Sequence, residues 1–261
     1  MIGIFDSGIG GLTVVRAVMD QLPGYDIVYF GDTARTPYGN KSSRTVVDYS
    51  LQNTRFLLDQ GANLVVMACN TASSVATETV NAQFDLPIYE VITPAVNQSL
   101  EMSKKKAIGV IGTRATISSG IYERKIHEKA PDARVYSSPC PLLVPLVEEG
   151  WLKKPETRMI VKKYLHPLKV RQIDTLILGC THYPLLKSII AHKIGKKVAI
   201  IDSSMALARE IRSFLDERPE IDQTLSKTGN NRFFVSDITP QFEKTARAVI
   251  KQNIALEHVS L

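Results

Sequence analysis

Cysteine is scarce in this chain of 261 residues, which contains only Cys69, Cys140 and Cys180. An odd number of widely spaced cysteines, without a Cys-x-x-Cys pair, argues against a disulfide framework and against a zinc site. The sequence therefore predicts three free thiols and no bound metal. Whether any of these thiols is reactive depends on where the fold places it.

Long apolar runs are also missing. No segment approaches the ~18 consecutive apolar residues that a membrane span needs. The first residues, Met1–Phe5, have neither the basic start nor the long apolar stretch of a signal peptide. We therefore expect a cytoplasmic protein that contacts no membrane.

Charge of one sign is not concentrated anywhere. The net charge of +6 comes from 32 basic and 26 acidic residues, and the lysines lie in short runs spread along the chain. These runs are not joined to aromatic residues or to a nucleic-acid-binding motif. A solvated basic surface is the simplest interpretation, and no nucleic-acid partner is required.

What the sequence does contain is a regular alternation of short apolar runs with segments of helical period. Strands that alternate with helices of this length predict an α/β fold built around parallel sheets. The predicted strands are Ile2–Phe5, Ile27–Phe30, Leu64–Ala68, Ile88–Val91, Ala107–Ile111, Arg134–Ser137, Thr175–Leu178 and Val198–Ile201. The predicted helices include Leu12–Leu22, Ser43–Gln60, Thr71–Phe84, Pro155–Leu165 and Ser204–Glu217.

A weak internal duplication divides the chain. The segment Ile2–Gly8 resembles Ile108–Arg114, and each is followed by an apolar strand that ends in a cysteine. Two related lobes, each presenting one cysteine at the end of a strand, are the simplest interpretation. We expect lobe A to span residues 1–95 and lobe B residues 96–205, with a C-terminal segment from 206 to 261.

Polar and reactive side chains follow four of the predicted strands. In open α/β sheets, ligands bind outside the carboxyl ends of the strands, where helix N-termini favour anionic groups. The four junctions are Asp6-Ser7, Cys69-Asn70-Thr71, Thr113 to Thr116, and Cys180-Thr181-His182. The glycines at 8, 10 and 11 do not complete a dinucleotide motif, because Thr13 occupies the place of its third glycine.

Cys69 and Cys180 occupy matching positions in this pattern. Alone, each would be interpreted as a small buried hydrophobic residue, as Cys140 is. At a predicted helix start, however, we expect the helix to lower the thiol pKa from ~8.5 toward neutrality. Two such thiols on opposite faces of a carbon acid would remove a proton from one face and deliver one to the other.

The polar neighbours of the two cysteines would then bind a small amino acid. Asp6 would hold its ammonium group, and His182 would orient or assist Cys180. Fixed donors would stabilise the carboxylate of the developing carbanion. These donors are Ser7, Asn70, Thr71 and Thr181. For each of these side chains, helix capping is the alternative role.

An ordered set of motifs over essentially the whole chain resembles the glutamate racemases. The motifs are Asp6-Ser7-Gly8, Gly31-Asp32, Pro37-Tyr38-Gly39, Cys69-Asn70-Thr71-Ala72, Leu146-Val147-Glu148-Glu149-Gly150 and Gly179-Cys180-Thr181-His182-Tyr183-Pro184. The resemblance implies two pseudo-symmetric, doubly wound lobes with the active site in the cleft between them. The C-terminal segment would return to lobe A, where Arg232–Ser236 and a following helix would pack.

The same resemblance implies interconversion of L- and D-glutamate without pyridoxal phosphate or any other cofactor, supplying D-glutamate for peptidoglycan. Cys69 would act on D-glutamate and Cys180 on L-glutamate. The assisting catalytic residues would be Asp6, His182 and Glu148, with Asp32 supporting them from behind. Substrate contacts would come from Asp6, Ser7, Tyr38, Gly39, Asn70, Thr71, Thr113, Thr116, Thr181 and His182. A homodimer is the expected assembly.

Two other functions are compatible with the sequence. A related two-cysteine enzyme, such as an aspartate racemase or a maleate isomerase-like lyase, would share the chemistry and differ in its substrate. A non-catalytic two-lobe binding or regulatory protein would keep the carboxylate-binding strand ends but would not need both thiols. Assays with L-glutamate and L-aspartate separate the first case, and alanine variants of the cysteines separate the second.

Overall fold

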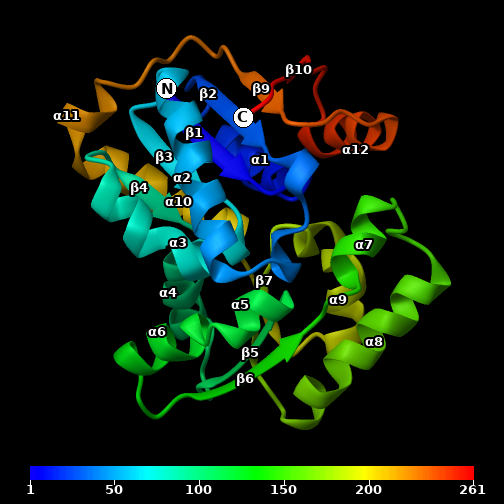
Figure 1. Cartoon of the computed structure of the whole chain (residues 1–261). Coiled ribbons are helices and arrows are strands. Elements are labelled where there is room, and N and C mark those ends of the chain that lie inside the picture. Colours follow the sequence, from blue (N-terminus) through cyan, green and yellow to red (C-terminus); the bar gives the residue numbers. More distant parts are fainter.

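The computed structural model describes residues 1–261 and contains two parallel sheets, one in each lobe (Figure 1). The first sheet has six strands, in the spatial order β10 (Leu256–His258), β9 (Arg232–Val235), β2 (Ile27–Gly31), β1 (Ile2–Asp6), β3 (Leu64–Met67) and β4 (Ile88–Glu90). The second sheet has four, in the order β6 (Arg134–Pro139), β5 (Ala107–Gly112), β7 (Thr175–Gly179) and β8 (Ala199–Asp202). We call the two units the first and second lobe.

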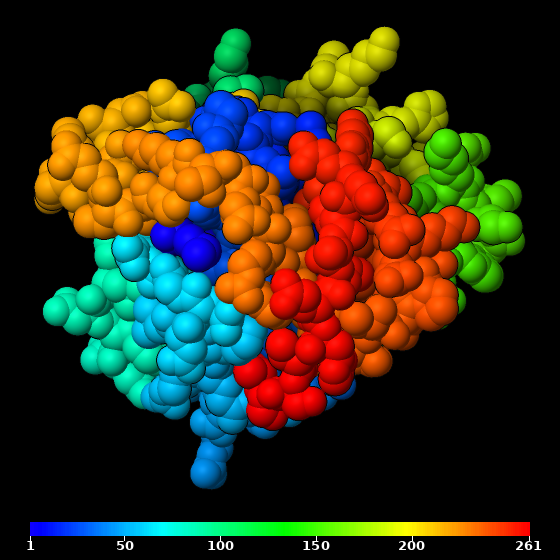
Figure 2. Space-filling view, turned by 90° about the horizontal axis from the view of Figure 1, so that it is seen from above, coloured from blue at the N-terminus to red at the C-terminus, as the bar shows by residue number.

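The two sheets repeat one topology. The order β2-β1-β3-β4 in the first sheet is matched by β6-β5-β7-β8 in the second, and all of these strands are parallel. The expected class, two pseudo-symmetric doubly wound α/β lobes, is confirmed. Strands β9 and β10 add to the free edge of β2, so that the end of the chain lies in the first lobe. Figure 2 shows this C-terminal part, in orange and red, beside the blue N-terminal part of the chain.

Twelve α-helices and three short 3-10 turns connect the strands. The helices are α1 (Gly11–Gln21), α2 (Ser43–Asp59), α3 (Asn70–Gln83), α4 (Ile92–Met102), α5 (Arg114–Ser118), α6 (Ile121–Lys129), α7 (Leu143–Glu148), α8 (Pro155–Val170), α9 (Lys187–Ile194), α10 (Ser203–Glu217), α11 (Pro219–Asp222) and α12 (Pro240–Ile250). The 3-10 turns are η1 (Thr33–Arg35), η2 (Tyr38–Asn40) and η3 (Tyr183–Leu186).

Helix α8 is longer than the sequence predicts. The predicted helix ends at Leu165, before Pro167, because proline removes a helix hydrogen bond. The observed helix continues through Pro167 to Val170. Leu165 and Leu168 are both buried, so the apolar face runs on past the proline and its packing outweighs the missing bond.

The chain crosses between the lobes twice, each time in a helix. Helix α4 leads from β4 to β5, and α10 leads from β8 back to the first lobe. The last strand before each crossing ends in an acidic residue that caps the helix. Glu90 accepts hydrogen bonds from the backbone N–H groups of Ile92 and Thr93, and Asp202 accepts one from Ser204. Such carboxylates satisfy the free N–H groups of a helix start.

The alternation of side chains along the strands divides the core between two faces. On β1, Ile2 and Ile4 belong to a cluster of 53 buried residues that extends into the second lobe, whereas Phe5 belongs to a separate cluster of 14. The smaller cluster lies under α2 and α3, and the larger one includes α1, α10 and α12. A continuous core under both lobes fixes how their strand ends face each other.

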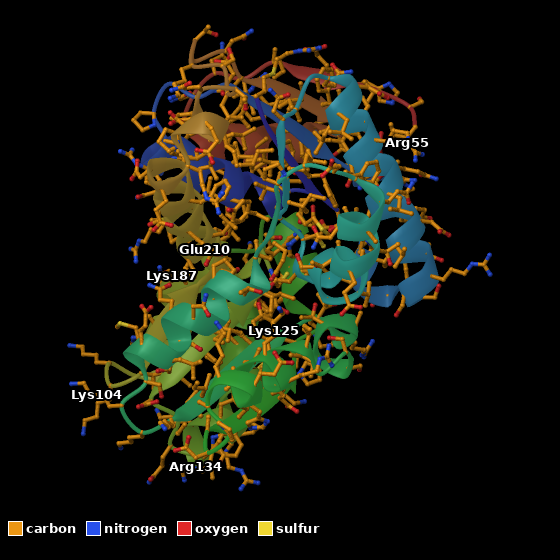
Figure 3. The ribbon with its side chains drawn as sticks, turned by 90° about the vertical axis from the view of Figure 1, so that its left-hand side faces the viewer. Arg55, Lys104, Lys125, Arg134, Lys187 and Glu210 are labelled. Carbon is orange, nitrogen blue, oxygen red and sulfur yellow. The ribbon has the colours of Figure 1, made fainter.

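Basic side chains are distributed over the outside of the molecule, in agreement with the expected solvated surface. Figure 3 shows Lys104 and Arg134 extending from the end of the second lobe that lies away from the first. None of the helices combines the length and the apolar character that a membrane-spanning segment requires.

Candidate active site

The carboxyl ends of the two sheets meet. Asp6 ends β1, and Thr181 follows β7 by two residues, yet the Thr181 hydroxyl donates to Asp6 Oδ1 over 3.3 Å. Farther along the same interface, Thr71 Oγ1 lies 3.0 Å from Thr113 Oγ1. Both pairs join the first lobe to the second. Parallel strands of each sheet end at one edge, and the contacts between the two edges bring together the four junctions that the sequence singled out.

Cys69 is buried beside Ser7 at the start of α3. Its Sγ lies 3.6 Å from Ser7 Oγ, and 5% of the residue is exposed. Burial and the charge of Asp6 raise the thiol pKa to about 12, although a hydrogen bond from the N–H of Ala72 lowers it. The prediction of a pKa near neutrality is therefore wrong for Cys69, because desolvation of the thiolate outweighs the helix N-terminus.

Cys180 lies directly after β7, and His182 and Glu148 stand behind it. His182 Nδ1 is 3.7 Å from Cys180 Sγ, and His182 Nε2 is 2.5 Å from Glu148 Oε1. Burial alone would lower the His182 pKa, but hydrogen bonds to Cys180 and Glu148 raise it well above its usual value. The imidazole thus lies between a thiol and a carboxylate, and both contacts favour its protonated form.

The backbone after Cys180 differs from the prediction. The sequence predicts a helix start there, like the one observed after Cys69. The chain instead turns through η3, and α9 begins only at Lys187. Pro184 lies in this turn, and the buried Tyr183 side chain donates to the carbonyl oxygen of Cys140. His182, rather than a helix N-terminus, is therefore the polar group beside the Cys180 sulfur.

Asp6 connects the two thiol regions. Its Oδ2 accepts hydrogen bonds from the N–H groups of Gly8 and Gly11, at 3.0 and 2.9 Å. Burial raises the pKa of the Asp6 carboxyl. The charge of His182 and the hydrogen bonds that Asp6 accepts lower that pKa. The loop between these glycines passes very close to the second lobe, since a Cβ added at Gly10 would lie 2.3 Å from Thr181 Oγ1.

Several predicted binding residues form a hydroxyl and amide cluster at the start of α3. Thr116 Oγ1 lies 3.3 Å from Thr71 Oγ1 and 3.0 Å from Thr113 Oγ1. Asn70 is 2% exposed, and its Oδ1 accepts a hydrogen bond from Tyr122. Its Nδ2 has no partner. A buried N–H donor without an acceptor is rare in proteins, and a ligand carboxylate would satisfy this one.

Tyr38 and Asp32 form the support on the first-lobe side. Tyr38 donates to Asp32, and Asn53 donates to Tyr38 over 3.0 Å. Arg35 pairs with Asp32 at 2.7 Å. Gly39 follows Tyr38 and reaches the second lobe, where an added Cβ would lie 2.8 Å from Thr113 Cβ. The Tyr38 hydroxyl is thus engaged by Asp32, and the Tyr38-Gly39 turn borders the strand ends of the second lobe.

Cys140 is set apart from this arrangement. Its thiol contacts the carbonyl oxygen of Ser138 at 3.5 Å, and burial raises its pKa to about 12. Its sulfur contacts no histidine, and the first N–H of α7, at Leu143, donates to the Cys140 carbonyl oxygen. No cluster of three or more histidine, cysteine, aspartate and glutamate side chains is arranged to hold a metal ion.

Two residues near the site were not predicted from the sequence, because only the fold brings them close to it. Tyr122 lies on α6 and contacts Asn70 of the first lobe, and Thr36 carries a buried hydroxyl without a partner near Gly8 and Glu148. Tyr122 occupies an apolar position of a helix, and Thr36 precedes the Pro37-Tyr38-Gly39 motif. Of the two, only Thr36 could have been predicted from the sequence, because it directly precedes that motif.

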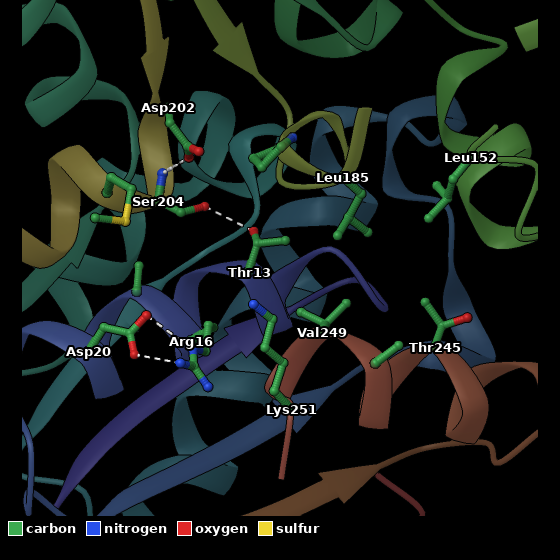
Figure 4. Close-up of a pocket in the computed structure, with 14 residues that line it drawn as sticks. Thr13, Arg16, Asp20, Leu152, Leu185, Asp202, Ser204, Thr245, Val249 and Lys251 are labelled. Atoms are coloured by element: carbon green, nitrogen blue, oxygen red, sulfur yellow. Dashed lines mark hydrogen bonds and ion pairs between the residues drawn. The ribbon is translucent and has the colours of Figure 1, made fainter. Parts of the chain in front are cut away.

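A cavity of about 300 Å³ lies outside the thiol site, between α1, α10, α12 and η3 (Figure 4). Thr13 lines it and donates to the carbonyl oxygens of Gly10 and Thr181, and its hydroxyl lies 2.9 Å from Ser204 Oγ. The backbone of the Asp6 loop and of Thr181 thus separates this cavity from the two cysteines.

Comparison with known proteins agrees with this geometry. Residues 13–211 match the model of the Asp/Glu/hydantoin racemase family. A glutamate racemase of Persephonella marina is 48% identical over 260 residues, covering all of this chain and 97% of that protein.

Solved structures agree as well. A glutamate racemase of Bacillus anthracis superposes with a TM-score of 0.94 at 37% identity, covering 100% of this chain and 97% of that one. A Francisella tularensis glutamate racemase, solved in complex with D-glutamate, gives 0.90 at 40% identity, with coverage of 99% and 97%. Two lobes, two strand-end thiols and full-length similarity lead to one conclusion: the chain belongs to the glutamate racemase family.

Proposed function

We propose that this protein interconverts L- and D-glutamate by proton transfer at Cα, without a cofactor, with Cys69 and Cys180 as the two acid–base groups. The proposal is supported by one buried thiol in each lobe, each next to a neighbour of the Asp6–Thr181 contact: Cys69 lies beside Ser7, and Cys180 lies beside His182. The names of the full-length relatives support glutamate as the substrate.

The chemistry balances with two thiols alone. One sulfur, as thiolate, takes the α-proton, so that a C–H bond breaks, an S–H bond forms and the electron pair stays on the substrate. The other sulfur, as thiol, then gives its proton to the opposite face of Cα. The enzyme ends with the two protonation states exchanged, and solvent restores them. Each direction of the reaction starts from the opposite state.

The two thiols are not equivalent in the structure. Cys180 lies beside His182, whereas burial raises the pKa of Cys69 to about 12. Burial therefore disfavours the Cys69 thiolate, and the step in which Cys69 takes the α-proton of D-glutamate needs added positive charge. The ammonium group of the bound substrate supplies positive charge that favours ionisation of Cys69 for the reverse direction.

Substrate recognition follows from the donors and acceptors at the strand ends. The free Nδ2 of Asn70 and the N-terminal N–H groups of α3 suit a carboxylate. Hydroxyls of Ser7 and Thr71 add further donors. We assign the substrate ammonium group to the Asp6 carboxylate, to which the Thr181 hydroxyl donates. Glu148 holds His182 in place through the contact at Nε2. A second carboxylate, as in glutamate, is accommodated by the Thr113 and Thr116 hydroxyls.

The biological role that fits this reaction is the supply of D-glutamate for peptidoglycan in the cytoplasm, by a homodimer. Growth of a D-glutamate-requiring bacterial strain on expression of this chain tests the role. Light scattering on the purified protein tests the dimer, which is contradicted by a molar mass equal to the 28.9 kDa of one chain.

The reaction itself is tested by incubating the purified protein with L-glutamate in deuterated buffer. We expect the circular dichroism signal of the amino acid to fall to zero, with one deuterium entering Cα for each inversion. Parallel incubation with L-aspartate serves as the specificity control. Activity on aspartate alone overturns the glutamate assignment, and inversion without deuterium overturns the use of two solvent-exchanging bases.

A further inference from the structure

Only one of the two polar atoms of the Asn70 side chain has a hydrogen-bond partner. Its Oδ1 accepts a 2.6 Å hydrogen bond from Tyr122 Oη, while Nδ2 is buried without a partner. Asn70 is the first residue of α3 and stands beside Cys69, at the positive end of that helix. A free N–H donor in this place is suited to a substrate carboxylate, provided that the amide is held with Nδ2 facing the site.

Tyr122 reaches this amide from the opposite lobe. It is the second residue of α6, it is 2% exposed, and the helix is preceded by Gly120 in the left-handed conformation. Its hydroxyl has one proton to donate, and Oδ1 receives it. A flipped amide would leave that proton unpaired and turn an oxygen toward the incoming carboxylate. The tyrosine therefore selects the orientation that presents Nδ2.

The ring of the same tyrosine touches the strand end that carries the other thiol. A Cβ added at Gly179, the residue before Cys180, would lie 3.1 Å from Tyr122 Cε2 and 2.8 Å from the carbonyl oxygen of Ile111. The Tyr122 ring packs against the backbone of Gly179, which has no side chain. Tyr122 thus contacts the neighbour of each reactive cysteine, Asn70 through its hydroxyl and Gly179 through its ring.

We propose that Tyr122 is a positioning residue of the active site, which aims Asn70 Nδ2 at a carboxylate of the substrate and sets the backbone from which Cys180 projects. The proposal deepens the proposed function and rests on it. Burial raises the pKa of Tyr122 well above its usual value, so the hydroxyl remains a donor at every working pH. The hydroxyl acts on carboxylate binding and hence on KM, whereas the ring acts on the thiol and hence on kcat.

Removing only the hydroxyl separates these two effects. For Tyr122→Phe we expect KM for both enantiomers of glutamate to rise about 5- to 10-fold, the usual effect of one lost hydrogen bond. We expect kcat to stay within about threefold, because the ring still covers Gly179. Tyr122→Leu, which removes the ring as well, lowers kcat by about tenfold or more.

The matched control is Tyr164→Phe, which removes a hydroxyl elsewhere in the second lobe. The Tyr164 hydroxyl only accepts a 3.4 Å hydrogen bond from the N–H of Leu142. We expect its KM and kcat to equal those of the wild type. If Tyr122→Phe has the same KM as Tyr164→Phe, the positioning role is overturned.

A double-mutant cycle tests whether Tyr122 acts through Asn70. In an Asn70→Ala background, Tyr122→Phe should change KM by less than about twofold, because the group that it positions is gone. Full additivity overturns the proposal. Asn70→Asp keeps an acceptor for Tyr122 but removes the Nδ2 donor, and we expect it to raise KM as much as Asn70→Ala does. A wild-type KM for Asn70→Asp also overturns the proposal, even if Tyr122→Phe does not fold.

Failure of this inference is distinguishable from failure of the proposed function. Wild-type protein that does not racemise glutamate contradicts the proposed function, whatever the variants do. Wild-type protein that racemises glutamate with an additive cycle contradicts only the role of Tyr122. Melting temperatures of all variants identify any loss of activity that comes from unfolding.

Discussion

At the scale of single residues, the three cysteines have different surroundings that give them different chemistry. Cys180 has a histidine beside it, Cys69 has a serine and a buried carboxylate, and Cys140 has a backbone carbonyl. All three are buried. Burial is therefore common to the three thiols, and the groups beside them are what differ.

The first prediction concerns loss of each thiol. We expect Cys69→Ala and Cys180→Ala each to lower the racemisation rate by about 10²–10⁴-fold, the usual contribution of one acid–base group. Cys140→Ala is the control and should retain full activity with a lower melting temperature, because it leaves a small buried cavity. The rate is measured by circular dichroism. Full activity in either Cys69→Ala or Cys180→Ala contradicts the two-thiol mechanism.

The second prediction follows from the raised pKa of Cys69. Because the thiolate is the reactive form and the pKa is about 12, its population rises with pH throughout the neutral range. Alkylation of Cys69 by iodoacetamide should accelerate about tenfold per pH unit from pH 7 to 9, with no plateau. Mass spectrometry of the Cys69 peptide measures the rate, and Cys69→Ala gives the background. A plateau below pH 9 would show a much lower pKa.

At the scale of secondary-structure elements, the sequence predicts the strands well and the helices unevenly. The eight predicted strands each end within two residues of the observed bounds, because buried parallel strands are short apolar runs between turns. Strand β10 has three residues, two of them exposed, and carries no such signal. Helix α8 continues past Pro167 because packing of its apolar face stabilises the helix. That packing is not visible in the local sequence.

The third prediction concerns the helix that carries the chain from the first lobe to the second. Glu90 caps the start of α4, whereas Glu101 lies in its last turn and is exposed. We expect Glu90→Ala to lower the free energy of unfolding by about 1 kcal/mol, as loss of a capping side chain does. Glu101→Ala should be neutral or slightly stabilising, since negative charge is unfavourable at a helix C-terminus. Urea denaturation measures both, and equal effects contradict the capping role.

At the scale of the whole molecule, hydrogen bonds join a segment near the C-terminus to Asp26 in the N-terminal part of the chain. Asp26, just before β2, accepts hydrogen bonds from the N–H groups of Thr228 and Asn230, at 2.8 and 3.0 Å, and from the Ser226 hydroxyl. This contact holds the segment that leads from α11 into β9. The first sheet is thus completed by residues more than 200 positions away along the chain.

The fourth prediction concerns how the stability contributed by the Asp26 contact depends on pH. Desolvation alone would raise the Asp26 pKa, but the hydrogen bonds that it accepts lower it to about 2. A carboxyl with a lowered folded-state pKa stabilises the fold above its ordinary pKa near 4, and the effect is lost as the pH falls toward 2. Asp26→Asn should therefore cost about 1 kcal/mol at pH 7, with the difference shrinking below pH 4.

The control for this prediction is Asp48→Asn, at an exposed position on α2, which should leave stability unchanged at every pH. Unfolding is followed by far-ultraviolet circular dichroism in urea. A difference between Asp26→Asn and the wild type that persists unchanged to pH 3 would show that the charge of Asp26 does not stabilise the contact.

The sequence by itself determined the α/β class, the repeated pattern of strands and the residues at the strand ends. Hydrophobic periodicity and strand termini are local properties, which is why the matching positions of Cys69 and Cys180 are visible in the sequence alone. Only the tertiary structure decided the charge state around them: burial raised the pKa of Cys69 in spite of the helix N-terminus at Asn70, and a turn placed His182 beside Cys180. It also brought Tyr122 to Asn70. Desolvation and contacts between lobes sum over residues far apart in the chain, so no local pattern contains them.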